Sequence, residues 1–267
     1  METIESITIL GGMDKSGGRE ELELTIRSGE IACIVGPTGS GKSRLLADIE
    51  CLAGGDSPTR RKVLVNGGLP GRELKKAYKN RLIAQLSQNM NFIMDISAMK
   101  FIMIHAQARM GQAGSCAARE LADKVIACAN GLSGESFLPE TPVTQLSGGQ
   151  SRALMIADTA LLSPAPIALI DEIENAGIDR KKALELLVSR EKIILMSTHD
   201  PILALSGHKR IVMQHGRIRE VLEAAPEERS NLAALEQVDR RLTQLREAIR
   251  SGGRIAGDMK SYFSLEG

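Results

Sequence analysis

The chain has 267 residues and a net charge of +1 at neutral pH. This length is sufficient for one large domain or two modest ones, each with a sizeable core. The balanced charge gives no strong attraction to nucleic acid, and two Tyr, four Phe and no Trp offer little stacking on bases, so we expect no nucleic-acid partner.

The cysteines, the N-terminus and the apolar stretches predict a cytoplasmic protein. None of the four cysteines forms a CxxC pair, so reduced thiols are expected rather than a zinc or redox motif. The N-terminus contains Glu2 and Glu5 and lacks the basic and long apolar regions of a secretory signal, so no such signal is expected. The longest apolar stretch, near 153–170, contains Asp158 and two prolines, so no membrane span is predicted. Any role at the cytoplasmic face of a membrane would therefore be peripheral.

The first third of the chain predicts strands around a glycine-rich loop. IACIV (31–35) is a continuous apolar run directly before GPTGSGKS (36–43), as in a buried strand that feeds a phosphate-binding loop. A helix is expected from Lys42 to about Leu52. Further strands are predicted at 3–10, 21–27, KVLVNG (62–67) and RLIAQL (81–86).

The middle of the chain predicts helices, and two buried strands follow. Residues 95–130 are expected to be helical, in two segments separated by GQAGS (111–115). The loop 130–145 then leads into LSGGQ (146–150) and a helix that ends near Leu162. The elements expected next are a strand PIALID (166–171), a helix near 179–190, a strand KIILMS (192–197) and a hairpin over 208–221.

The C-terminal tail carries an apolar stripe of helical spacing. Its members alternate by three and four residues: Leu235, Val238, Leu242, Leu245 and Ile249. Two heptads are too few for a stable coiled coil. The stripe therefore predicts an amphipathic helix that either packs on its own domain or forms a dimer contact.

The segment GPTGSGKS matches the phosphate-loop pattern GxxxxGK[ST] in full and lies between a strand and a helix, as that motif requires. Glycines let backbone N–H groups turn toward phosphates, and the helix N-terminus adds positive potential. Lys42 is expected to reach the β- and γ-phosphates, and the Ser43 hydroxyl to bind Mg²⁺. The expected nucleotide contacts are Gly36, Pro37, Thr38, Gly39, Ser40, Gly41, Lys42 and Ser43.

A pair of acidic residues, Asp171 and Glu172, follows the apolar strand in IALIDE (167–172). Carboxylates at such a position are costly to bury unless they hold a metal or activate a water. Asp171 is expected to face Mg²⁺ and its water shell, and Glu172 to act as general base for the attacking water. The pair alone is a weak signal, but together with the phosphate loop it indicates a P-loop NTPase.

With LSGGQ between these two motifs, residues 1–220 resemble the ATP-binding cassette (ABC) ATPases. Gln88 follows a strand, Asp179 follows the acidic pair and His199 lies in STHD (197–200), all in the order and spacing of that family. The resemblance implies an α/β fold, a RecA-like P-loop NTPase core with an N-terminal antiparallel β subdomain. It also implies an ATPase domain over 1–221, with a helical subdomain inserted at about 88–160, and a C-terminal helical extension over 222–267.

The resemblance further implies that two such subunits, identical or different, pack head to tail around ATP. Ser147, Gly148 and Gly149 of one subunit would contact the γ-phosphate of ATP on the other, with Gln150 ending the motif. Asp179 would cross the interface. The catalytic residues implied are Lys42, Gln88, Glu172 and His199, and the residues implied at Mg²⁺ are Ser43, Gln88 and Asp171.

Three departures from the family pattern stand out. GGMDKSGGREE (11–21) has no aromatic residue to stack on adenine, and Met13 is nearest to the expected place. Ile173 replaces the usual proline, and the segment that leads to Asp179 is one residue longer than usual. Asp158 occupies a position that is often basic. No catalytic residue is lost, so we expect an active ATPase with weak selectivity for the base.

Two functions fit these motifs. The first is the ATP-hydrolysing subunit of an ABC transporter, in which dimer closure and reopening move separate transmembrane subunits. The alternative is a soluble ABC ATPase that assembles, activates or remodels a partner protein. A regulatory nucleotide binder without catalysis is disfavoured by the intact Glu172 and His199. The five methionines of 90–110 are expected mostly in the core, with a pliable docking groove as the minority interpretation.

Overall fold

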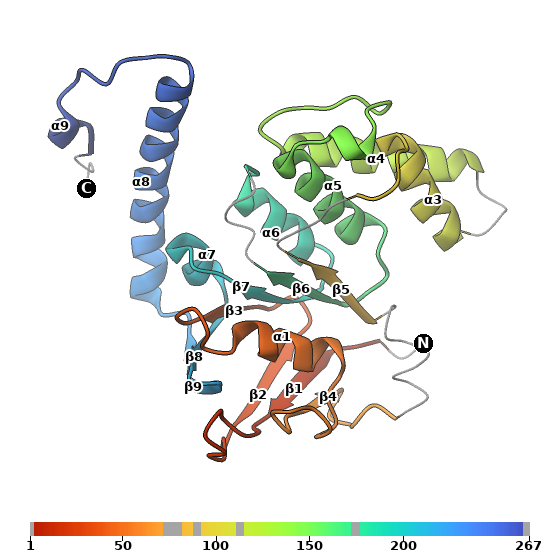
Figure 1. Ribbon diagram of the computed structural model, residues 1–267, viewed down its shortest axis with the longest axis vertical. Helices are drawn as coiled ribbons and strands as arrows, with labels where there is room; N and C mark the ends of the chain where they lie inside the picture. The colour runs from red at the N-terminus through yellow and green to blue at the C-terminus, as the bar shows by residue number, and fades with distance from the viewer. Residues whose placement is uncertain (1–2, 72–81, 88–91, 111–114, 172–176, 264–267) are drawn as a thin grey trace.

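Two sheets organise the protein in the computed structural model, which describes residues 3–71, 82–87, 92–110, 115–171 and 177–263 (Figure 1). The smaller sheet is antiparallel, in the order β2-β1-β4. Its strands are β1 (Ser6–Leu10), β2 (Glu23–Arg27) and β4 (Lys62–Val65). This is the antiparallel N-terminal subdomain that the sequence predicted.

The larger sheet has the order β5-β6-β7-β3-β8-β9, and all its neighbouring strands are parallel except β8 and β9. The central strands are apolar at nearly every position because both faces of a parallel sheet are covered. The strands are β3 (Ile31–Val35), β5 (Ile83–Leu86), β6 (Ile167–Asp171), β7 (Ile193–Ser197), β8 (Lys209–Gln214) and β9 (Arg217–Glu223).

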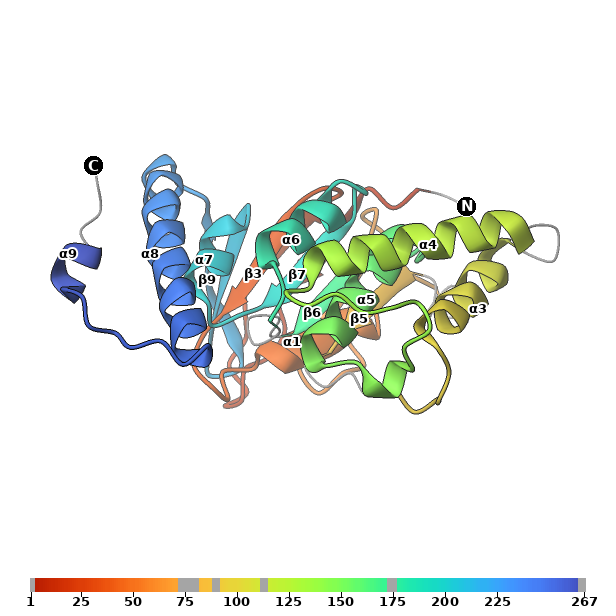
Figure 2. The ribbon, with the colours of Figure 1, turned by 90° about the horizontal axis from the view of Figure 1, so that it is seen from above.

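Helices cover the larger sheet on both faces (Figures 1 and 2). On one face lie α1 (Lys42–Glu50) and the small sheet, which share one apolar core. On the other face lie α3 (Ala98–Met110), α4 (Ser115–Leu132), α5 (Gly148–Leu161) and α6 (Arg180–Val188), which share the second core. Successive residues of β3 alternate between the two cores: Cys33 packs with the helices and Ile34 with α1.

Three further helices follow β7: α7 (Pro201–Ser206), which lies in the connection from β7 to β8, and then α8 (Pro226–Arg250) and α9 (Met259–Phe263). The stripe expected in the tail falls within α8. The short helix α7 was not expected, although Asp200 caps it and Pro201 opens it, two signals that the sequence did contain. Among the described residues, no helix is long and apolar enough to cross a membrane.

An ion pair inside the helical subdomain accounts for the unusual Asp158. His105 on α3 lies 3.0 Å from Asp158 on α5, measured from Nδ1 to Oδ2. The hydrogen bond to this carboxylate raises the pKa of His105, although burial opposes the shift. The acidic residue at this position therefore belongs to a local contact between two helices.

A buried arginine joins the small sheet to the rest of the molecule. Arg61 is fully buried, and its guanidinium contacts Glu20 at 2.9 Å and Asp48 of α1 at 3.3 Å. It also donates to the carbonyl of Gly216, in the turn between β8 and β9, at 2.8 Å. One side chain thus links three separate parts of the fold.

We predict that Arg61→Met destabilises the protein by about 3–5 kcal/mol, because two buried carboxylates would lose their cation. The free energy of unfolding can be measured in urea by far-ultraviolet circular dichroism, since the chain has no Trp. The exposed neighbour Arg60 is the control, and Arg60→Met should change stability by less than about 0.5 kcal/mol. Equal effects of the two substitutions would contradict this role.

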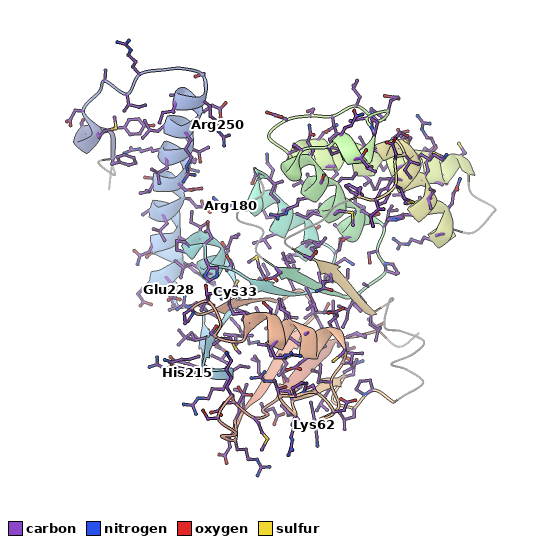
Figure 3. All side chains as sticks on the ribbon, in the orientation of Figure 1. Cys33, Lys62, Arg180, His215, Glu228 and Arg250 are labelled. Carbon is purple, nitrogen blue, oxygen red and sulfur yellow. The ribbon has the colours of Figure 1, made fainter. Side chains whose placement is uncertain are left out.

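We also predict that the contribution of His105 to stability depends on pH. Because its folded pKa is raised, the contribution is fully present below the unfolded pKa of about 6.5 and is lost as the pH rises through the folded pKa. His105→Gln should therefore destabilise the protein more at about pH 5.5 than at about pH 8.5, by roughly 1 kcal/mol or less for this partly exposed pair. The exposed His215 (Figure 3) is the control, and a similar pH dependence for His215→Asn would refute the assignment.

Candidate functional site

The phosphate-loop glycines occupy backbone conformations that other residues rarely adopt. Gly36, Gly39 and Gly41 have φ angles of 146°, 78° and 108°. At Gly36 a Cβ atom would lie 2.4 Å from the carbonyl oxygen of Met213 in β8. The glycines thus allow both the left-handed turn and the close approach of the loop to β8.

Two lysines lie against this loop. Lys42 donates from Nζ to the carbonyls of Gly36 at 2.8 Å and Pro37 at 3.3 Å, so its ammonium is held over the loop that it follows. Lys15, in the segment before β2, donates to the carbonyl of Gly39 at 2.7 Å. The second lysine was not identified from the sequence, where it stands in a glycine-rich stretch with no motif. Both ammonium groups favour an anion at the loop.

Two of the residues expected at Mg²⁺ come from the carboxyl ends of parallel strands of the larger sheet, since Ser43 follows β3 and Asp171 ends β6. Ser43 is exposed in the first turn of α1, and Asp171 is half-buried at the end of β6, in register with Ser197 of β7. Hydroxyl and carboxylate oxygens suit Mg²⁺, which is usually held by one or two protein groups together with nucleotide phosphates. Among the described residues, no group of three or more His, Cys, Asp or Glu side chains could hold a metal ion. Gln88 and Glu172 lie outside the described residues.

The serine of LSGGQ begins α5 with a reciprocal cap. Ser147 Oγ accepts from the backbone N–H of Gln150 at 3.3 Å, and Gln150 Oε1 accepts from the N–H of Ser147 at 2.9 Å. A Cβ added at Gly148 would meet no atom within 4 Å. The helix therefore presents open backbone at its positive end, which suits an anion.

Asp179 and His199 lie at the N-terminal ends of α6 and α7. Asp179 caps α6 by accepting from the backbone N–H of Lys182 at 3.1 Å, and its own N–H donates to the carbonyl of Leu132 at 2.8 Å. His199 is exposed and directly precedes Asp200, which caps α7. Both residues line one cavity of about 920 Å³, so the structure does bring them together.

The segment expected to face the base is a tight loop without an aromatic ring. Met13 is half-buried, and its N–H donates to the carbonyl of Thr59 at 2.6 Å. The neighbouring Asp14 accepts backbone hydrogen bonds from Gly18 and Ser16, both at 2.8 Å, and these lower its pKa. A polar loop thus occupies this place.

Comparison with known proteins gives a family. The protein-family model described as ABC transporter matches residues 20–175 of this chain. An uncharacterised ABC transporter ATP-binding protein of Methanocaldococcus jannaschii is 49% identical over 253 residues, which cover 94% of this chain and 95% of the relative. The similarity therefore extends beyond the matched domain into the tail.

Solved structures show the same fold. A dimeric ATP-binding cassette from Methanocaldococcus jannaschii, in a post-hydrolysis state with ADP and phosphate, has a TM-score of 0.61 and 26% identity and covers 82% of this chain and 99% of its own. The protein cbiO1 of Clostridium perfringens, part of the ABC transporter complex cbiONQ, has a TM-score of 0.65 and 20% identity and covers 93% of this chain and 100% of its own. The chain belongs to the family of ABC transporter ATP-binding proteins.

Proposed function

We propose that the chain is an ATP-hydrolysing subunit that closes as a dimer around ATP and thereby drives separate transmembrane subunits. The observation that carries this proposal is the placement of its two phosphate-facing motifs. The phosphate loop opens α1 and LSGGQ opens α5, and these helices pack on opposite faces of the six-stranded sheet (Figure 1). Within one chain the two motifs are therefore separated by the sheet, and the LSGGQ segment that faces the bound ATP would come from a second copy.

The proposed chemistry divides between the two copies. Lys42, the backbone N–H groups of 36–43 and Lys15 would hold the phosphates, and the Ser43 hydroxyl and Asp171 carboxylate would hold Mg²⁺. Bound Mg²⁺ supplies positive charge at the β- and γ-phosphates. Ser147 and the N-terminus of α5 on the partner copy would face the γ-phosphate, because a capped helix start offers N–H groups to an anion.

The remaining roles rest on the motif positions. Glu172 would accept a proton from the attacking water, Gln88 would orient that water and sense Mg²⁺, and His199 would donate to the γ-phosphate as charge develops. Asp179 would reach across the dimer. Its place beside His199 in one cavity supports a shared role at the interface.

We predict that Glu172→Gln lowers the rate constant for ATP hydrolysis by about 10²–10⁴-fold while ATP still binds, because an amide cannot accept the proton. Phosphate release measures turnover, and size-exclusion chromatography with ATP should show a trapped dimer. The exposed Glu185 of α6 provides the control, and Glu185→Gln should behave as wild type. Unchanged turnover in Glu172→Gln would remove the role given to Glu172.

An exposed apolar segment supports a partner that docks on the helical side. Ile93 is 96% exposed and Met94 is 50% exposed, directly after the segment of Gln88. Exposed neighbours of this kind are typical of an interaction site rather than of a core. Each of the two interpretations of the methionines fits one residue. Met99 is buried in the core, whereas Met94 is exposed where a partner could contact it.

We predict that Ile93→Asp weakens binding of a membrane subunit by about 2 kcal/mol, roughly thirtyfold in Kd, as loss of a central apolar contact does. Co-purification from native membranes measures binding, and ATP affinity should be unchanged. Leu69, which is 53% exposed beyond β4, gives the control Leu69→Asp. If the wild-type chain co-purifies with no multi-span protein, the transporter role fails and the soluble, partner-remodelling ATPase is favoured.

A further inference from the structure

The tail helix α8 is attached to the protein mainly by charge. None of its 25 residues is buried. Three acidic side chains on one face reach basic partners on the ATPase domain: Glu228 with Arg210 at 2.6 Å, Glu236 with Lys181 at 3.0 Å and Asp239 with Arg180 at 2.6 Å. Few buried apolar contacts are typical of an element that can detach or shift at modest cost.

Arg180 differs from the other two basic residues because it holds two carboxylates at once. One end of its guanidinium pairs with Asp200 and the other with Asp239. Arg180 itself is labelled in Figure 3. Its side chain is only 22% exposed, so solvent screens these pairs less than surface pairs. The planar fork of arginine fixes the direction of both bonds, which a lysine could not do.

Arg180 and its partner Asp200 each lie next to a residue expected at the interface around the γ-phosphate. Arg180 directly follows Asp179, and Asp200 directly follows His199. Asp200 also accepts from the backbone N–H groups of Ile202 at 2.8 Å and Leu203 at 3.1 Å, and so holds the start of α7. A shift of Arg180 would therefore move both segments together.

Cavities on both sides of Arg180 leave it room to rearrange. One of about 920 Å³ contains His199, and another of about 530 Å³ extends toward α7, and both are lined by Asp179, Arg180 and Asp239. Arg180 thus connects α6 to α8 at a place where both cavities border it. The bridge can exist in distinct arrangements, because Arg180 can pair with both carboxylates, with Asp200 only or with Asp239 only.

We propose that Arg180 is a positioning residue for ATP hydrolysis and that the tail sets its geometry through Asp239. Docking of α8 orients the guanidinium, the guanidinium holds Asp200, and Asp200 places His199 relative to Asp179. This inference rests on the proposed ATPase function, in which both residues act at the interface around the γ-phosphate. It assigns the tail a part in the reaction although α8 lies outside the matched residues 20–175.

The test compares two substitutions on the same helix. Asp239→Asn removes the carboxylate that orients Arg180, whereas Glu236→Gln removes the neighbouring pair with Lys181, which does not reach Asp200. We expect Asp239→Asn to lower kcat for ATP about tenfold, as small displacements of catalytic groups do, with KM and ATP affinity within about twofold of wild type. Glu236→Gln should leave kcat within about twofold, and Asp239→Glu should restore most of the activity.

Amide hydrogen exchange gives a second measurement that needs no turnover. Asp239→Asn should speed exchange at Ile202 and Leu203, which donate to Asp200, and Glu236→Gln should not. An unchanged or increased kcat in Asp239→Asn, or equal effects of the two variants on kcat, would overturn the positioning role. An inactive wild-type chain would instead overturn the proposed ATPase function and this role with it.

Discussion

The buried charge network around Arg61 is the constraint on which the nucleotide site depends. Arg61 binds Glu20 beside the small sheet, Asp48 of α1 and the carbonyl of Gly216 in the β8–β9 turn. Gly216 in turn donates its N–H to the carbonyl of Ser40 at 2.8 Å. The arginine is therefore two contacts away from the phosphate loop, and it joins the three elements that surround that loop.

The phosphate loop is accordingly shaped by packing as much as by its own glycines. A Cβ at Gly41 would lie 3.0 Å from the Cα of Gly216, and one at Gly36 would clash with the β8 backbone. Arg61 and Glu20 hold this turn in place, because Arg61 donates to the carbonyl of Gly216 and Glu20 accepts from the N–H of Ile218. Glu20 accepts from Ile218 as well as from Gly12 at 3.1 Å, so its carboxylate anchors β9 to the segment before β2.

Much of this architecture was predictable, because periodicity and glycine motifs act locally. The strands IACIV, IALID and IILMS are continuous apolar runs, and the phosphate loop needs only its own residues to be recognised. Arg61 was not predictable. It lies in the run Arg60, Arg61, Lys62, and only the folded chain shows that its neighbours face solvent (Lys62 in Figure 3) while it is buried.

The same limit applies to the tail and to the helical subdomain. The stripe of α8 predicted a helix and left its docking open, because the contacts that hold it come from acidic residues on another face. Asp158 looked like a departure from the family until the fold placed His105 beside it. Charge pairs between distant segments leave no periodic signal, so the sequence could not reveal them.

The two arginine networks differ in burial, and this difference matches their places in the fold. Arg61 has no exposed surface, so breaking its pairs would strand charges in the core at a cost of several kcal/mol. Arg180 and its two carboxylates are partly exposed and border cavities, so one pair can replace the other with little desolvation. The fold thus keeps a permanent network behind the phosphate loop and an exchangeable one beside His199. This division fits the proposed ATPase function, in which the phosphate loop would keep its shape while the contacts beside His199 rearrange.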